Sequence, residues 1–265
     1  MILRRVARTL LPVVVSLALI LGAWQGLIEY LSVSPLVARS PGDVWAYLVS
    51  GEEAAAHRRL VWDGLGITLN GAGFGLFAGL LAAAVVAIVF VLSRTVEQAF
   101  LPVAMIIRSV PLVAMTPLVT LVFGRALLAT TVICGIVVFF PALVIIVHGL
   151  RSASPWAADL VRAYGGSTGT IMRKVMIPSA LPSFFTAARM SAPAAIVGAL
   201  LAEWLATGQG IGYRMLLDVT TFNSDDLWAS VVVVTLASLL IYSLISVLEG
   251  FVLARFGPVP AVEAG

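Results

Sequence analysis

The chain has 265 residues, of which 61% are hydrophobic and only 11% are charged. Soluble domains carry about 25% charged residues, so this composition excludes an ordinary soluble protein and indicates that lipid is the main solvent. The net charge of +3 rests on few residues and gives no reason to expect a nucleic-acid partner. In a membrane protein, the positions of the basic residues carry more information than their number.

Long uncharged stretches recur along the chain, and about 20 apolar residues are enough to cross a bilayer core. We expect six transmembrane helices. The third is short at 16 residues, and the fifth contains Arg189 and Glu203 near opposite ends, where a charge reaches an interface. The predicted spans are Thr9–Ile28, Gly64–Ser93, Ser109–Gly124, Ala126–Leu150, Phe184–Ala206 and Leu227–Leu248.

The first apolar stretch is long enough to span, and no small-residue cleavage site follows it cleanly. We therefore expect a retained helix rather than a removed signal peptide. The single cysteine, Cys134, lies in the apolar run VICGIVVFF. One thiol cannot form a disulfide framework, so a packing role is expected.

Basic residues set the orientation, because cytoplasmic loops carry an excess of Lys and Arg. With both termini inside, ten basic residues fall on the cytoplasmic side and five outside, so this topology is favoured over its reverse. The inner set is Arg4, Arg5, Arg8, Arg94, Arg151, Arg162, Arg173, Lys174, Arg189 and Arg255; the outer set is Arg39, Arg58, Arg59, Arg125 and Arg214; Arg108 is undecided.

The segments outside the bilayer are small, so we expect a single transmembrane domain over 1–265, with a core of about 64–252. The outer segment Glu29–Asp63 contains SPGDVWAYL, which predicts a turn followed by a short interfacial helix. A second outer loop, Thr207–Asp226, contains GQGIGY. The longest inner segment is Arg151–Pro182, within a cytoplasmic loop of about 151–187.

The inner segment is amphipathic and predicts two short helices. The first runs over Trp156–Tyr164, Gly165-Gly166-Ser167 breaks it, and the second covers Thr168–Met176 before Pro178 and Pro182 end it. Two helices at a glycine elbow form a compact knob that a groove on a partner could hold. Positive charge comes from Arg162, Arg173 and Lys174, and apolar anchors are expected at Tyr164, Ile171 and Met172.

This segment resembles the cytoplasmic signature loop of permeases in binding-protein-dependent ABC importers, in particular the nitrate/sulfonate/taurine branch. Asp159-Leu160-Val161 occupies the acidic-Ala-Ala triplet, Gly165 the glycine four positions after it, and Val175–Pro178 the hydrophobic close. The triplet departs from the pattern, with Asp for the usual Glu and larger apolar residues for the alanines. Ala180-Leu181-Pro182 extends the match.

Two further motifs and the outer SPGDVW run support the resemblance, which covers about Ser40 to Pro258. The third span contains the Pro-x-x-Ala-x-x-Pro-Leu run, and the segment after the fifth contains the Glu…Gly-x-Gly-Tyr run. The matching residues are Pro111, Ala114, Pro117, Leu118, Phe123 and Gly124 in the first run, and Glu203, Gly208, Gly210, Ile211, Gly212 and Tyr213 in the second.

The resemblance implies an all-α type I importer permease in a bacterial inner membrane, working as a homodimer with two cytoplasmic ATPase subunits and an external solute-binding protein. It implies ATP and Mg on the ATPase, no cofactor on this chain, and a small, anionic or sulfur- or nitrogen-containing solute. The ATPase contact is expected at Asp159, Arg162, Ala163, Tyr164, Gly165, Gly166, Ser167, Ile171, Met172 and Pro178; the path or gate at Arg108, Pro111, Pro117 and Glu203; and the outer loop at Gly208, Gly210, Gly212 and Tyr213.

Several single residues allow two interpretations. Arg108 either lies at the inner boundary, snorkelling or in a salt bridge, or lines the path and attracts an anion. Glu203 needs a partner, either Arg214 or a backbone donor, and is a structural group or part of a gate. Gly165 serves as a helix cap and as part of the contact loop. His148 is expected to be structural, and the small residues of Gly64–Ala84 to allow close helix packing.

Two other classes of membrane protein fit less well. A membrane-embedded enzyme needs clustered catalytic groups, and the two histidines, His57 and His148, are predicted on opposite sides of the bilayer. A self-sufficient secondary transporter needs matching halves and intramembrane ionisable residues for coupling. The sequence has no Gly-x-x-x-x-Gly-Lys-Ser/Thr motif, so we expect ATP hydrolysis to be carried out by another chain.

Overall fold

The computed structural model describes residues 2–256, except for the side chains of residues 2–10, 12, 13, 105 and 256. Within this part of the chain the secondary structure is helical, with no strand. The predicted inner residues Arg4, Arg5 and Arg8 have side chains outside the described set. The chain divides into two compact units: unit 1 is Met1–Gly64 with Arg214–Val234, and unit 2 is Leu65–Tyr213 with Thr235–Gly265.

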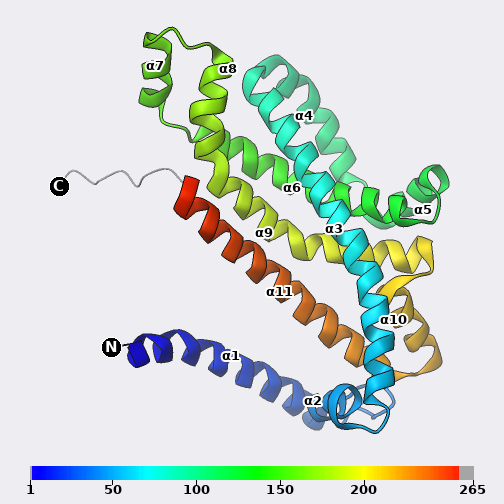
Figure 1. The fold of residues 1–265 in the computed structure, drawn as a ribbon. Helices are drawn as coiled ribbons and strands as arrows, with labels where there is room; N and C mark the ends of the chain where they lie inside the picture. The colour runs from blue at the N-terminus through cyan, green and yellow to red at the C-terminus, as the bar shows by residue number, and fades with distance from the viewer. Residues whose placement is uncertain (1, 257–265) are drawn as a thin grey trace. The chain divides into compact units, whose positions relative to one another are not determined.

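Unit 2 contains α3 (Ala54–Leu92), whose first residues belong to unit 1, α6 (Leu127–Arg151), α9 (Ile177–Ala202) and the later part of α11 (Ser224–Phe256). Figure 1 shows α6 and α9 side by side. Cys134 of α6 is fully buried between Gly75 of α3 and Gly198 of α9, where a methyl group on either glycine would press against it. The predicted packing roles of Cys134 and of the small residues in α3 are therefore confirmed.

The third predicted span, Ser109–Gly124, contains one helix that is shorter than expected. The structure has α4 (Arg94–Ser109) and α5 (Leu112–Phe123), with axes bent by 100° at the break between them. Val110 and Pro111 adopt extended backbone angles, as expected where a proline excludes the helical conformation from the residue before it. The helix of the predicted third span is therefore Leu112–Phe123, because the first three residues of Ser109–Gly124 lie at the end of α4 and in the break.

Within the described residues, four helices are long and apolar enough to cross a membrane, and the number becomes five if the bent pair counts as one span. They are Ala54–Leu92, Leu127–Arg151, Thr168–Thr207 and Ser224–Arg255. The apolar part of α1 (Ile2–Tyr30) that can be described, Val14–Tyr30, is shorter than this class requires. An all-helical, multi-span membrane fold is confirmed, while the count of six spans and the side of the termini stay predictions.

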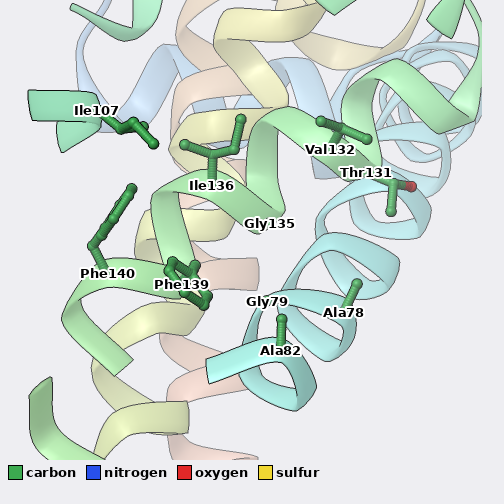
Figure 2. Close-up of a pocket in the computed structure, with 10 residues that line it drawn as sticks. All are labelled: Ala78, Gly79, Ala82, Ile107, Thr131, Val132, Gly135, Ile136, Phe139 and Phe140. Carbon is green, nitrogen blue, oxygen red and sulfur yellow. The ribbon is translucent and has the colours of Figure 1, made fainter. Parts of the chain in front are cut away.

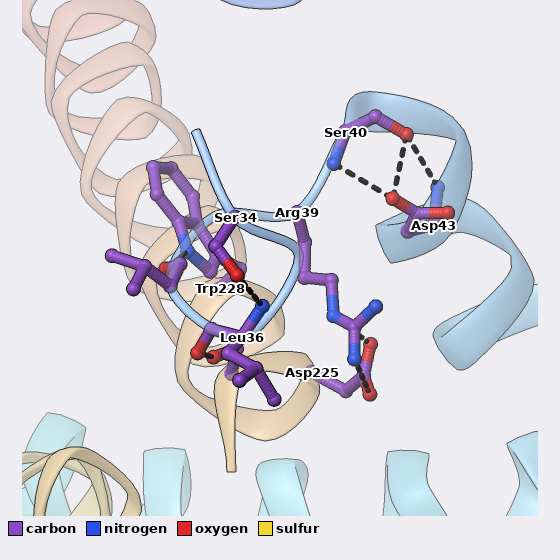
Figure 3. Close-up of polar contacts among 9 residues, drawn as sticks. Ser34, Leu36, Arg39, Ser40, Asp43, Asp225 and Trp228 are labelled. Atoms are coloured by element: carbon purple, nitrogen blue, oxygen red, sulfur yellow. Dashed lines mark hydrogen bonds and ion pairs between the residues drawn. The ribbon is translucent and has the colours of Figure 1, made fainter. Parts of the chain in front are cut away.

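Unit 1 joins the segment after α1 to the start of α11 (Ser224–Phe256). The ring of Trp24 stacks on Trp228 with centroids 5.3 Å apart. Arg39 forms an ion pair with Asp225 at 2.8 Å, and the indole N–H of Trp228 donates to a backbone carbonyl of the 31–40 loop (Figure 3). These contacts fix the loop onto the first turn of α11.

The predicted turn and interfacial helix at SPGDVWAYL are present as α2 (Pro41–Trp45) followed by a π-helical turn, η1 (Ala46–Ser50). Ser40 caps α2: its hydroxyl accepts from the Asp43 N–H, and the Asp43 carboxylate accepts from the Ser40 N–H at 2.9 Å (Figure 3). This reciprocal pair satisfies donors that the helix itself leaves open. The segment after Thr207, which is predicted to lie outside, also contains a helix, α10 (Gly210–Thr221).

Candidate functional site

The glycine elbow expected in the inner segment is present. α7 (Pro155–Ala163) ends one residue before Tyr164, and α8 (Thr168–Ile171) begins after Ser167, whose hydroxyl accepts from the Thr170 N–H. Gly165 has φ +77°, a conformation that side chains disfavour, and the Gly166 N–H donates to the Val161 carbonyl at 2.8 Å. Gly165 therefore follows the helix end, and the chain reverses sharply there.

The second helix of the elbow does not end at the prolines. α8 continues through a π-helical turn, η2 (Met172–Met176), into α9 and then η3 (Glu203–Thr207), so that one helix of 40 residues runs over Thr168–Thr207. Pro178 lies in the first turn after η2, and Pro182 lies inside α9. A proline removes one helical hydrogen bond, and a wider turn beside it lets the backbone continue. The prediction that Pro178 and Pro182 end the helix is therefore wrong.

Three large side chains are exposed at helical spacing along α7 and its C-cap residue, Tyr164. Trp156, Leu160 and Tyr164 have exposed fractions of 86%, 60% and 87%. Residues four apart lie on the same face of a helix, so the three side chains form one stripe. Sequence reasoning found Tyr164 but missed the other two, although their i, i+4, i+8 spacing was visible. We call these three residues the α7 stripe.

The opposite face of α7 packs inside the elbow. Ala158, Ile171 and Val175 form a buried cluster, with Val161 and Met176 packed against it. Ile171 and Met172 are only 3% and 4% exposed. The expectation that they offer apolar anchors to a partner is wrong, because Ile171 packs inside the elbow and Met172 is also buried.

The other residues expected in this loop lie mostly at its surface. Asp159 and Arg162 form an exposed ion pair at 2.7 Å along α7. Gly166 and Pro178 are half-buried, and the exposed members are Asp159, Arg162, Ala163, Tyr164, Gly165, Ser167, Arg173 and Lys174.

Arg108 lies deep along α6 rather than beside its end. With Pro111 and Met115 it lines a cavity of about 320 Å³ whose other wall is Ile136–Pro141 of α6. Glu97, at the start of α4, pairs instead with Arg151 at the end of α6, at 2.6 Å. Phe140 is roughly three helical turns from Arg151, so Arg108 lies beside the middle of α6, and both interpretations of its role stay predictions. Among the described residues Arg108 forms no ion pair. Pro117 is exposed within α5.

Glu203 is 2% exposed and sits in a cradle of backbone and hydroxyl donors. Its Oε2 accepts from the Thr68 hydroxyl at 2.9 Å and from the Gly212 N–H at 2.8 Å. The same Thr68 hydroxyl accepts from the Ile211 N–H at 3.1 Å. Arg214 pairs instead with Asp226, so of the two expected partners for Glu203 the structure shows the backbone donor.

The glycines of GQGIGY are explained by this cradle. Gly208 and Gly210 have φ of +67° and +89°, which favour glycine. A Cβ on Gly210 would overlap the Glu203 carboxylate, and one on Gly212 would lie 2.9 Å from its Oε2. The motif therefore lets the backbone at the start of α10 approach a buried carboxylate. Tyr213 is half-buried after it.

Two cavities beside these groups differ in chemistry. Glu203 lines a small polar cavity of about 140 Å³, which we call the Glu203 cavity, together with Arg125 in the turn before α6 and with residues of α6 such as Thr130. A second cavity, of about 290 Å³, is almost wholly apolar and lies between α3, the end of α4 and α6, with Gly79, Ile107 and Phe139 in its wall (Figure 2). The polar cavity can bind charged groups, whereas the apolar one suits hydrocarbon.

The described residues contain no group of three or more His, Cys, Asp or Glu side chains that could hold a metal ion. His57 stacks on Tyr47 within unit 1, with ring centroids 3.9 Å apart. His148 of unit 2 lines a cavity with Glu97 and Arg151.

A bundle of long apolar helices, with a helical elbow joined directly to one of its spans, defines a membrane-embedded transport subunit. Residues 75–257 match the family described as binding-protein-dependent transport system inner membrane component, so the chain belongs to that family. Such a chain is the non-enzymatic membrane subunit of an importer in the plasma membrane, with a separate ATPase subunit and a solute-binding partner.

Curated relatives agree with this family. The chain is 28% identical to a probable ABC transporter permease protein of Haemophilus influenzae, over 72% of this chain and 78% of the relative. It is 25% identical to the taurine transport system permease protein TauC of Escherichia coli, over 85% and 82%. It is also 28% identical to the putative aliphatic sulfonates transport permease protein SsuC of the same organism, over 92% and 86%.

The fold is that of known importer permeases. A structure of the MetNI methionine ABC transporter, in an inward-facing conformation, superposes with a TM-score of 0.63 at 20% identity, covering 76% of this chain and 99% of that one. The expected type I permease fold is confirmed.

Proposed function

We propose that two copies of this chain form the translocation path of an ATP-driven importer, with the α7 stripe seated in a groove of each ATPase. The single observation that carries the proposal is the continuity of the elbow with the 40-residue helix Thr168–Thr207. A stiff helix transmits a rigid-body displacement from the ATPase into the bilayer, which a flexible loop would not. ATP and Mg are bound by the ATPase.

The α7 stripe has the properties of an energetic hot spot. Exposed Trp and Tyr side chains dominate many protein interfaces, and here the buried cluster beneath them holds α7 against α8 and η2. Arg173 and Lys174, exposed on η2, add positive charge close by. The stripe is therefore preorganised, so little ordering cost opposes binding.

Replacement of the stripe tests this contact. Trp156→Ala is expected to weaken binding of the ATPase by about 2 kcal/mol, which raises Kd roughly 30-fold and lowers the amount of ATPase that co-purifies. Trp45→Ala is the matched control, because Trp45 is also exposed, at 63%, but lies on α2 in the predicted outer segment. Equal loss in both variants, or none in either, would contradict the contact.

Topology can be tested with the same chain, because its one cysteine is buried. Glu52→Cys in the outer segment is expected to react with a membrane-impermeant maleimide added to intact cells, whereas Ser167→Cys in the elbow is expected to react only after permeabilisation. External labelling at Ser167→Cys would overturn both the orientation and the ATPase contact. Both positions are exposed.

For the solute we propose a small sulfur- or nitrogen-containing molecule with an anionic group, supported by the relatives named for taurine and aliphatic sulfonates. Arg108 supplies a positive charge along the path, where a guanidinium can bind such a group. Arg108→Ala is expected to leave the assembly intact and to lower transport, with Arg108→Lys intermediate. Unchanged transport in Arg108→Ala would indicate that this residue has only a structural role.

A further inference from the structure

A cavity of about 310 Å³ lies where the last turns of α3 and α6 meet the first two turns of α4. Phe90 contributes from α3, Leu101 from α4 and Arg151 from α6, and the ring of Phe90 also packs edge-on against Phe100 of α4, with centroids 5.5 Å apart. These segments all belong to unit 2 (Figure 1). We call this the α6-end cavity, and it shares no residue with the elbow or with the cavity beside Arg108.

The wall of the α6-end cavity changes from apolar to charged along α6. Leu143, Val144 and Val147 lie deeper in the helix, whereas His148 and Arg151 lie in its last turn. Because the apolar spans in α3 and α6 both end here, the charged end of the cavity is expected at the bilayer boundary and the apolar end within the bilayer. Val144 is 63% exposed, so the apolar end is open to lipid. A ligand that matches this order carries its charge at the boundary and hydrocarbon below it.

The ion pair at the charged end leaves most donors of Arg151 open. Its Nη2 donates to Oε2 of Glu97 at 2.6 Å, and within the described residues the guanidinium makes no other hydrogen bond. A guanidinium has five N–H donors in one plane, a geometry that matches two oxygens of a phosphate. The side chain of Arg151 is 44% exposed, compared with 14% for Glu97. The arginine, and not the carboxylate, is therefore the group that an incoming ligand reaches.

Positive charge exceeds negative charge around this end of α4 and α6. Glu97 offsets Arg151, but Arg94, one helical turn before Glu97, is exposed and forms no ion pair within the described part of the chain. His148 is exposed in the wall of the cavity and adds a ring N–H donor. Basic pockets between membrane spans bind anionic lipid headgroups. The local charge therefore favours an anionic headgroup over one with a terminal ammonium.

We propose that the α6-end cavity binds an anionic phospholipid, with its phosphate on Arg151 and the start of one acyl chain along Val144 and Leu101. The cavity is much smaller than a phospholipid, so the rest of the lipid stays in the bilayer. Bound in this way, the lipid holds the start of α4 against the end of α6, just before α7 begins. The proposal requires only that the chain spans a membrane and does not depend on the proposed import function.

Native mass spectrometry of the full chain released from detergent micelles tests the proposal, because it identifies each bound lipid by its mass. The probes are dioleoylphosphatidylglycerol and dioleoylphosphatidylcholine, which share acyl chains and phosphate and differ in net headgroup charge. Phosphatidylglycerol is expected to bind about tenfold more tightly, since the choline ammonium is repelled by the arginines. Glycerol 3-phosphate, which has the phosphate without the chains, is expected not to displace the bound lipid.

The two partners of the Glu97–Arg151 ion pair are expected to act in opposite directions. Arg151→Gln removes the phosphate donor and is expected to weaken phosphatidylglycerol binding about tenfold, whereas Glu97→Gln removes a repulsive charge and is expected to strengthen it several-fold. A pair that only holds α4 against α6 would give changes of the same sign. Arg59→Gln, the same substitution at an exposed position near the other end of α3, is the control and is expected to leave binding unchanged.

Three results would overturn the proposal: equal binding of the two lipids, binding of phosphatidylglycerol that both substitutions in the ion pair weaken or leave unchanged, or displacement of the lipid by glycerol 3-phosphate, which would indicate a site for a soluble anion. Thermal unfolding of each variant is recorded in parallel. If Arg151→Gln does not fold, Glu97→Gln decides alone, because unchanged or weaker phosphatidylglycerol binding in that variant contradicts the proposal.

Discussion

Gly210→Ala tests the Glu203 cradle most directly. Gly210 has φ +89°, so any side chain there is strained by roughly 1–2 kcal/mol. The added methyl would also overlap the Glu203 carboxylate and displace it from its donors. Loss of one hydrogen bond to a charged group costs about 1.5–3 kcal/mol. Together these effects predict a loss of about 3–5 kcal/mol in the free energy of unfolding.

Gly208→Ala is the matched control for this perturbation. Gly208 also has a positive φ, +67°, but nothing lies within 4 Å of an added Cβ. Its substitution is expected to cost only the strain, about 1–2 kcal/mol. The assay is thermal unfolding of the detergent-solubilised chain followed by tryptophan fluorescence, where each kcal/mol shifts the midpoint by roughly 2–4 °C.

A second background separates strain from overlap. In a Glu203→Ala chain the obstructing carboxylate is gone, so adding Gly210→Ala is expected to cost no more than Gly208→Ala does. The coupling between the two sites would then be about 1.5–3 kcal/mol. Equal effects of Gly208→Ala and Gly210→Ala in the otherwise unchanged protein would refute the cradle as an energetic unit.

Three further outcomes are expected in the same unfolding assay. Gly75→Ala, whose methyl group would press on α6, is expected to lower the free energy of unfolding by about 1–3 kcal/mol. At Gly73 nothing lies within 4 Å of an added methyl group, so Gly73→Ala is expected to be neutral or slightly stabilising. Arg189→Ala leaves Glu249, its partner at 2.8 Å, without an ion pair and is expected to lower the free energy of unfolding by about 3 kcal/mol. Adding Glu249→Leu is expected to recover most of this loss, and equal losses in the single and double variants would contradict the pairing. Burial and the neighbouring Asp226 raise the pKa of Asp218 to about 6 from 3.8. The folded chain therefore binds this proton more tightly than the unfolded chain does, and the free energy of unfolding falls as pH rises from about 4 to 7. Asp218→Asn is expected to remove this pH dependence, and an unchanged pH profile in the variant would contradict the role of Asp218.

The sequence by itself determined the class of protein, because composition and apolar run length are sufficient to identify membrane-spanning helices. It also located the glycine elbow and the capped turn at Ser40, since both depend on local backbone rules that a few neighbouring residues satisfy. The helix limits were less predictable. Pro178 and Pro182 indicate a stop locally, yet the π-helical turn before them allows the helix to continue.

Only the tertiary structure decided which side chains are available to partners. Tyr164 and Ile171 look alike as apolar anchors in the sequence, but one is exposed and the other closes the interior of the elbow. The choice of the Thr68 hydroxyl and the Gly212 N–H as donors to Glu203, rather than Arg214, likewise depends on contacts across 135 and 9 residues of chain. Partner choice of this kind follows from how helices pack, and periodicity along one helix carries no information about the position of the next.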